Sequence, residues 1–165
     1  MKAIVLADTH IPSRARSLPR PLLADLEGAD LIVHAGDLAT LDVLNMLCLY
    51  GPVRAVHGNV DEPELRRVLP RRLMFQLGDR TVGLVHGDSP SLPTLQRARA
   101  EFVDEPVDAI VFGHSHRPLL RREGDLVLFN PGSPTDRRAE PRFSYGRLWL
   151  GDDGRLLAEH VWIDP

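Results

Sequence analysis

Ala3-Ile4-Val5-Leu6-Ala7-Asp8-Thr9-His10 is an apolar run that ends in a polar cluster, and this pattern recurs along the chain. Apolar runs such as residues 3–7 and 109–112 are typical of buried strands. In α/β sheets, ligands bind in the crevice beyond the carboxyl ends of the strands. We therefore expect clusters that are distant in sequence to meet in the folded protein. The six clusters are Asp8-Thr9-His10, Gly36-Asp37, Gly58-Asn59-Val60-Asp61, His86-Gly87-Asp88, Gly113-His114-Ser115-His116 and Asn130-Pro131-Gly132-Ser133.

The rest of the chain predicts an α/β fold in which two packed sheets have helices outside them. The last third is mostly β, with turn signals at residues 124–125 and 152–154 that suggest antiparallel hairpins. The expected strands are 2–7, 30–35, 53–57, 107–112 and short runs within 119–163, the expected helices are 18–28, 39–50, 62–69 and 91–103, and residues 73–77 and 81–85 form a hairpin.

Length and composition limit the class of protein. A chain of 165 residues with 43% hydrophobic and 26% charged residues predicts a single domain, 1–165. The formal net charge of −3 argues against general nucleic-acid binding or binding to a membrane surface. No segment has the length of a membrane span, so we expect a cytoplasmic enzyme. Cys48, the one cysteine, lies in an apolar stretch that predicts burial.

Each cluster also has a simpler interpretation. Asp8 and His10 lie two residues apart and can meet one metal ion from an extended backbone, but Asp8 is also a plausible helix cap. Asp37 has two carboxylate oxygens that can bridge two cations, although it or Thr40 is equally a plausible cap. Asn59 offers a carbonyl oxygen to a hard cation, yet Gly-Asn is common in β-turns.

The histidines differ in how strongly they indicate a site. His86 ends an apolar run, where a single histidine is more often structural. The pair His114 and His116 follows a glycine and a strand and is the most specific single signal. We assign His34 and His57 supporting roles near the site, and His160 a place on the surface.

Together these motifs resemble the calcineurin-like metallophosphoesterase family, whose pattern runs D-x-H, G-D, G-N-x-D/E, H and G-H-x-H. Every element occurs here, in that order, across residues 8–116. The segment 130–133 and the short length resemble the small YfcE-type phosphodiesterases. The resemblance implies a β-sandwich of two mixed sheets flanked by helices, in α-β-β-α layers.

The resemblance also implies two divalent metal ions. Manganese is the expected metal, with nickel, iron or zinc as alternatives. A water shared by two such cations has a pKa lowered to about 7 and can attack phosphorus in line. By this resemblance, the first ion would bind Asp8, His10, Asp37 and His116. The second would bind Asp37, Asn59, His86 and His114, so that Asp37 bridges the two ions. The catalytic residues would be Asp37, Asn59 and His86.

The implied substrate is a small phosphodiester. Arg137 and Arg138 follow the 130–133 turn and are candidates to contact substrate phosphate beside Asn59, although a solvated polar loop is an equal interpretation. Val60 stands where protein-phosphatase relatives have a histidine that serves as general acid, and Asp88 stands where several relatives have a second histidine. Asp61 and Asp88 are the first alternative acids.

Two rival functions remain open. One is a metal-dependent phosphomonoesterase, and the other is a non-catalytic scaffold like the retromer subunit that shares this fold. The presence of metal-competent residues at all seven positions favours an enzyme. A homo-oligomer is compatible with the sequence.

Overall fold

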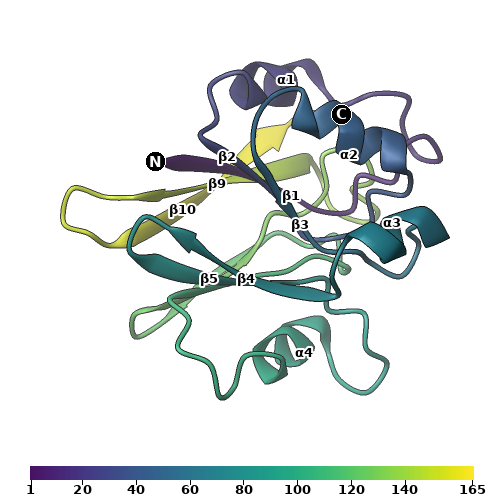
Figure 1. Ribbon diagram of the computed structural model, residues 1–165. Coiled ribbons are helices and arrows are strands. Elements are labelled where there is room, and N and C mark those ends of the chain that lie inside the picture. The colour runs from purple at the N-terminus through teal and green to yellow at the C-terminus, as the bar shows by residue number, and fades with distance from the viewer.

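Two five-stranded sheets pack face to face and carry helices on their outer faces (Figure 1). The computed structural model describes residues 1–165. One sheet has the strand order β10-β9-β1-β2-β3 and the other the order β4-β5-β6-β8-β7. The strands are β1 (Lys2–Leu6), β2 (Leu31–His34), β3 (Val53–Ala55), β4 (Arg72–Leu77), β5 (Arg80–Val85), β6 (Ala109–Val111), β7 (Leu119–Glu123), β8 (Leu126–Asn130), β9 (Phe143–Leu150) and β10 (Leu156–Ile163).

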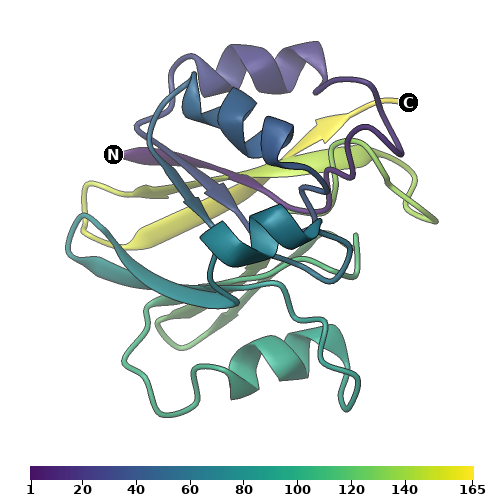
Figure 2. The same cartoon turned by 45° about the vertical axis from the view of Figure 1, so that its right-hand side comes forward.

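The helices lie as the α-β-β-α prediction requires, and Figure 2 shows α1 and α2 above the first sheet and α4 below the second. Each expected helix is present but shorter at its ends, and α1 and α4 begin directly after Pro19 and Pro93. No helix is long and apolar enough to cross a membrane. The helices are α1 (Arg20–Leu26), α2 (Leu41–Cys48), α3 (Pro63–Val68) and α4 (Thr94–Ala100).

Strand alternation divides the core into layers. In β1, Ala3 and Val5 face the second sheet, whereas Ile4 and Leu6 face the helices. A separate cluster joins α4 to the outer face of the second sheet. Because both faces of β1 are buried, this strand consists entirely of apolar residues after Lys2.

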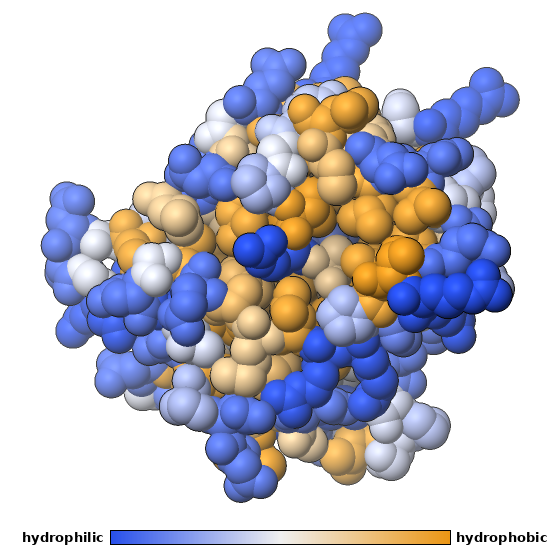
Figure 3. Space-filling view, in the orientation of Figure 1, coloured by the Kyte–Doolittle hydropathy of each residue, from blue (hydrophilic) through white to orange (hydrophobic).

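The prediction that Cys48 is buried is wrong. Val43 and Leu47 form the buried side of α2, and Cys48 is turned by about 100° from Leu47 around the helix, so it is exposed. The following Leu49 is 86% exposed. Figure 3 shows hydrophobic residues gathered over α2 and β3 on the face seen in Figure 1, with hydrophilic residues around them.

Strand direction brings the polar clusters together. β1, β2 and β3 are mutually parallel, and so are β5, β6 and β8. The segments that follow β1, β2, β3, β5 and β6 therefore leave each sheet at its carboxyl edge. The three hairpins β4–β5, β7–β8 and β9–β10 turn at the opposite end, because β4, β7 and β9 run antiparallel to their neighbours.

Candidate metal centre

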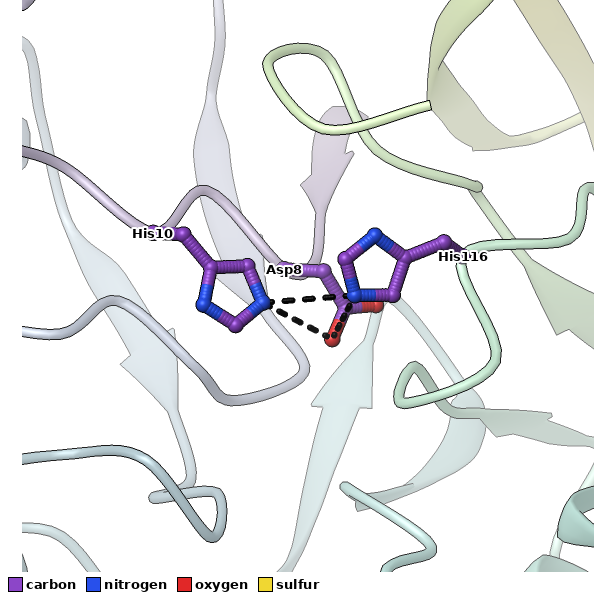
Figure 4. A group of neighbouring side chains, drawn as sticks. All are labelled: Asp8, His10 and His116. Atoms are coloured by element: carbon purple, nitrogen blue, oxygen red, sulfur yellow. Dashed lines mark hydrogen bonds and ion pairs between the residues drawn. The ribbon is translucent and has the colours of Figure 1, made fainter. Parts of the chain in front are cut away.

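The seven candidate metal ligands form one continuous cluster. Asp8 and His10 follow β1, and His116 follows β6 from the other sheet. Figure 4 shows both imidazole rings turned toward the Asp8 carboxylate. The His10 and His116 rings stack with their centroids 5.1 Å apart and their Nε2 atoms 3.3 Å apart. Together these three side chains form a buried triad whose ligand atoms lie within 4.8 Å of one another.

Asp37 connects this triad to the remaining candidates. Its Oδ2 lies 3.6 Å from His10 Nε2 and 3.2 Å from His86 Nε2. Asp8, Asp37 and His86 form a second buried triad with the same 4.8 Å spacing. The two triads thus share Asp8. Asp37 Oδ2 lies between the His10 ring, which belongs to the first triad, and the His86 ring, which belongs to the second. This is the position that the predicted bridging role requires.

Asn59 and His114 complete the cluster on its more open side. Asn59 Oδ1 lies 3.2 Å from His86 Nε2 and 3.1 Å from His114 Nδ1. Asn59 is exposed and His114 half-buried, whereas Asp8, His10, Asp37, His86 and His116 are all buried. Solvent therefore reaches the cluster from the Asn59 side.

The structure excludes helix capping by Asp8 and Asp37. Helix α2 begins after Thr40, so Asp37 is not its cap, and its Oδ1 instead accepts a hydrogen bond from the Val60 N–H at 3.0 Å. No helix begins near Asp8, because the next one, α1, starts at Arg20. Thr40 occupies the cap position of α2 but makes no side-chain capping bond.

Backbone contacts orient two of the histidine rings. His86 Nδ1 lies 2.7 Å from the Ala35 carbonyl oxygen, and His116 Nδ1 lies 2.5 Å from that of Asp136. In each pair the ring Nδ1–H donates to the oxygen, so that the neutral ring has the lone pair of its Nε2 directed into the cluster. Neutral imidazoles held in this way are suitable metal ligands.

The charges inside the cluster are strongly coupled. Burial raises the pKa of Asp8 to about 7, with the charge of Asp37 adding to the effect. Burial also opposes ionisation of Asp37, but the hydrogen bond and charge of His86 outweigh it and lower the pKa to about 2. Burial disfavours charge on His86 too, yet Asp37 and Asp8 raise its pKa to about 9. Without a metal, a proton on His86 therefore offsets part of the negative charge.

The residues fit divalent cations. Asp8 Oδ2 is buried and has no hydrogen-bond partner. Burial lowers the pKa of His116 to about 4, so its ring is neutral, and its Nε2 lies 3.3 Å from that of His10. Asp8 Oδ1 and Asp37 Oδ2 each lie within 4.0 Å of ring Nε2 atoms of the cluster. Mixed N/O donor sets of this kind suit first-row transition metals.

Asp61 is a supporting residue whose role the sequence alone did not reveal. Its buried carboxylate accepts N–H bonds from Asp37 at 3.1 Å, Ala39 at 2.7 Å and Gly58 at 2.6 Å. These bonds tie the loop after β2 to the loop after β3. Because all three contacts come from backbone donors, Asp61 acts as a hydrogen-bond acceptor that positions Asp37. This arrangement does not fit the acid role considered for it from the sequence.

The remaining histidines lie outside the cluster. His34 is buried, and its Nε2 lies 3.1 Å from Oγ1 of Thr9, the residue between Asp8 and His10 in the sequence. His57 is half-buried near the Gly58 carbonyl. The prediction of a surface position for His160 is wrong. Alternation along β10 turns His160 inward with Leu156, and its Nε2 lies 2.8 Å from the Asn130 carbonyl oxygen.

Arg137 and Arg138 lie on a loop beside the cluster rather than among the ligands. Arg137 donates from Nη1 to the Glu140 carbonyl at 2.6 Å, within its own loop. Arg138 is exposed, with its Nε 4.0 Å from Asp136 Oδ2. The positive charge of Arg138 acts to lower the pKa of Asp8, His10 and His116, so it favours loss of the proton from each of them.

Comparison with known proteins identifies the family. Residues 1–153 match the calcineurin-like phosphoesterase superfamily domain. The chain belongs to this superfamily. A probable metallophosphoesterase of Methanothermobacter thermautotrophicus is 38% identical over 158 residues, which cover 95% of this chain and 90% of that protein.

Solved structures share the fold. Wild-type Vps29 of Entamoeba histolytica, complexed with Zn²⁺, has a TM-score of 0.78 at 23% identity and covers 98% of this chain and 99% of its own. A novel archaeal phosphodiesterase has a TM-score of 0.73 at 19% identity and covers 99% of this chain and 100% of its own. These structures confirm the predicted fold class.

Proposed function

We propose that this protein is a dinuclear metal-dependent phosphodiesterase of the small YfcE type that hydrolyses small phosphodiesters, with manganese as the preferred metal. The observation that carries the proposal is the convergence of seven candidate ligands from both sheets, with Asp37 Oδ2 within 3.6 Å of His10 and 3.2 Å of His86. The phosphodiesterase among the solved structures that share the fold supports the choice of reaction.

The proposed ligands fall into two sets that meet at Asp37. Asp8, His10 and His116 would hold the first ion, and Asn59, His86 and His114 the second. When bound, such ions activate water and neutralise the charge that develops on a phosphoryl group. The fixed Nδ1–H bonds of His86 and His116 keep their rings oriented for that role.

The position that holds the general acid in protein-phosphatase relatives supplies none here. Val60 is 47% exposed, and its side chain carries no proton donor. Asn59 is exposed and His114 half-buried, so this side of the cluster is open to solvent. We therefore expect hydrolysis to depend steeply on leaving-group pKa, with activated diesters cleaved fastest.

The test uses purified protein, added manganese and two matched substrates, bis(4-nitrophenyl) phosphate and 4-nitrophenyl phosphate. We expect a higher kcat/KM for the diester and loss of turnover in excess chelator. His116→Ala should deplete chiefly the first ion and His114→Ala chiefly the second. A preference for the monoester would favour the phosphomonoesterase alternative, and absence of hydrolysis with every metal would favour the scaffold.

A further inference from the structure

A charged hollow lies next to the metal centre and contains none of its candidate ligands. It has a volume of about 270 Å³ and is lined by Ser115, Arg117, Arg137, Arg138, Ala139 and Glu140. Ser115 lies between His114 and His116 in the sequence, so one wall of the hollow belongs to the loop that carries these two candidate ligands. A group bound here would lie beside the metal centre without competing for its ligands.

Three hydrogen bonds fix the loop that forms this hollow against the ligand segments. Ser133 Oγ donates to the Asp8 carbonyl at 2.8 Å, and Thr135 Oγ1 donates to that of Thr9 at 2.6 Å. The Asp136 carbonyl accepts the bond from His116 Nδ1 at 2.5 Å. Arg138 follows two residues later, so its distance from the metal centre is set by the same contacts that orient the ligands.

Two of the three arginines keep their donors available. Arg117 Nε lies 3.8 Å from Glu140 Oε1, and Arg138 Nε lies 4.0 Å from Asp136 Oδ2, both beyond hydrogen-bond distance. Arg138 also has a backbone φ of 49°, a region that side chains other than glycine rarely adopt. Arg137 instead donates to the Glu140 carbonyl and lies 5.8 Å from the centre of the Phe143 ring, which holds the loop in shape.

The charge of the hollow suits a phosphate monoester. Three guanidinium groups and one carboxylate line it, which leaves a net charge of two positive units in a chain whose overall net charge is −3. A phosphate monoester carries about −1.5 to −2 at pH 7. Guanidinium groups bind phosphate oxygens through paired, charge-assisted hydrogen bonds.

We propose that Arg117 and Arg138 bind a second, non-scissile phosphate of the substrate, so that the preferred diesters carry a terminal phosphate monoester. This inference rests on the proposed phosphodiesterase function. The scissile phosphate lies at the metal centre, and the terminal phosphate lies in the Arg117–Arg138 hollow on the far side of Ser115. Nucleotide diesters with a 3′-phosphate have this chemistry.

The test compares thymidine 5′-(4-nitrophenyl phosphate) with the same compound carrying a 3′-phosphate. We expect kcat/KM to be at least about tenfold higher for the 3′-phosphorylated diester, because a charge-assisted contact contributes about 1.5–3 kcal/mol. Arg117→Ala and Arg138→Ala should each reduce this substrate ratio about tenfold. Arg121→Ala, an exposed arginine on β7 outside the hollow, should leave the ratio unchanged. A parental ratio near one, or equal ratios in all variants, would overturn the inference.

A binding measurement separates this inference from the proposed function. Calorimetry in excess chelator compares thymidine 3′,5′-bisphosphate, thymidine 5′-phosphate and inorganic phosphate. The bisphosphate should bind most tightly, and Arg138→Ala should remove that advantage while Glu140→Gln increases it. If inorganic phosphate binds as tightly as the bisphosphate, the hollow is a site for free phosphate and the substrate assignment is wrong. If neither diester is hydrolysed, the proposed function fails and this measurement alone decides the inference.

Discussion

The two ends of the β-sandwich use different residues to make the same kind of backbone conformation. At the hairpin end, the positive φ angles belong to Gly78, Gly124 and Gly154. At the metal-centre end, Gly36, Gly87 and Gly132 are joined by seven residues other than glycine with positive φ, namely Asp8, His10, Asp37, Ala39, His114, His116 and Arg138. A non-glycine residue in this region costs about 1–2 kcal/mol. The difference shows that the ligand loops keep side chains where stability alone favours glycine, as is common at functional sites.

The largest effect should come from Asp37, which joins both halves of the cluster. Asp37→Asn should reduce kcat about a thousandfold or more, because Lewis-acid stabilisation is worth several kcal/mol. Metal content measured alongside turnover checks the cause. Asp79→Asn, in the exposed β4–β5 turn at the other end, is the matched control and should keep parental activity. Similar losses of turnover in Asp37→Asn and Asp79→Asn would mean that the metal-centre end and the hairpin end do not differ in their importance for activity.

Asp61 tests how the strained loop after β2 is held. Asp61→Asn replaces one acceptor oxygen with a donor that faces backbone N–H groups, so the free energy of unfolding should fall by about 2 kcal/mol. Metal affinity should fall with it, because Asp37 loses its anchor. Urea denaturation of the metal-free protein measures the first effect and metal titration the second. Unchanged stability would mean that the loop keeps its shape without these bonds.

His34 should make stability depend on pH. Burial lowers its pKa to about 3, whereas the unfolded chain takes up the proton near 6.5. Because the unfolded state binds more protons between these values, stability falls as pH falls below 6.5. Between pH 7.5 and pH 5 the parent should lose about 2 kcal/mol more than His34→Gln. Parallel stability curves for the two proteins would contradict this account.

The smallest effects form a pair with opposite signs. Ala39 has a φ of 87°, so Ala39→Gly should relieve strain and raise the free energy of unfolding by about 0.5–1 kcal/mol after the entropy of the unfolded chain is counted. Gly124 has a φ of 61° and open space around it, so Gly124→Ala should lower stability by a similar amount. Thermal unfolding of both variants measures the pair. If both substitutions changed the free energy of unfolding in the same direction, the backbone strain would not differ between the two ends.

The sequence predicted the regular part of the fold better than its details. Apolar runs and turn signals located every strand and helix, because both report burial and backbone preference. The order of the clusters predicted that Asp8, Asp37 and His86 would meet, since parallel strands end at one edge. The half-buried position of His160 follows from alternation along β10, but its polarity alone suggested the surface. Cys48 was misplaced because an apolar stretch does not reveal which side of a helix is buried.

The support of the ligand loops could not be predicted from the sequence. The three N–H bonds to Asp61 and the contact of Asp136 with His116 join segments that are far apart in the chain. Positive φ is uncommon for any residue other than glycine, although Asp and His adopt it more readily than most, and its presence at Asp8, His10 and His114 becomes visible only in the folded backbone. Local propensity does not predict either feature at a given position.

The central claim is that the strained end of the sandwich holds two divalent cations that together hydrolyse a phosphodiester. The most direct measurement titrates manganese into chelator-treated protein while bound metal and diester turnover are followed in the same samples. We expect two ions per chain, with turnover that rises fully only when the second ion binds. Full turnover at zero bound metal, or a protein that binds no manganese at any concentration, would contradict the claim.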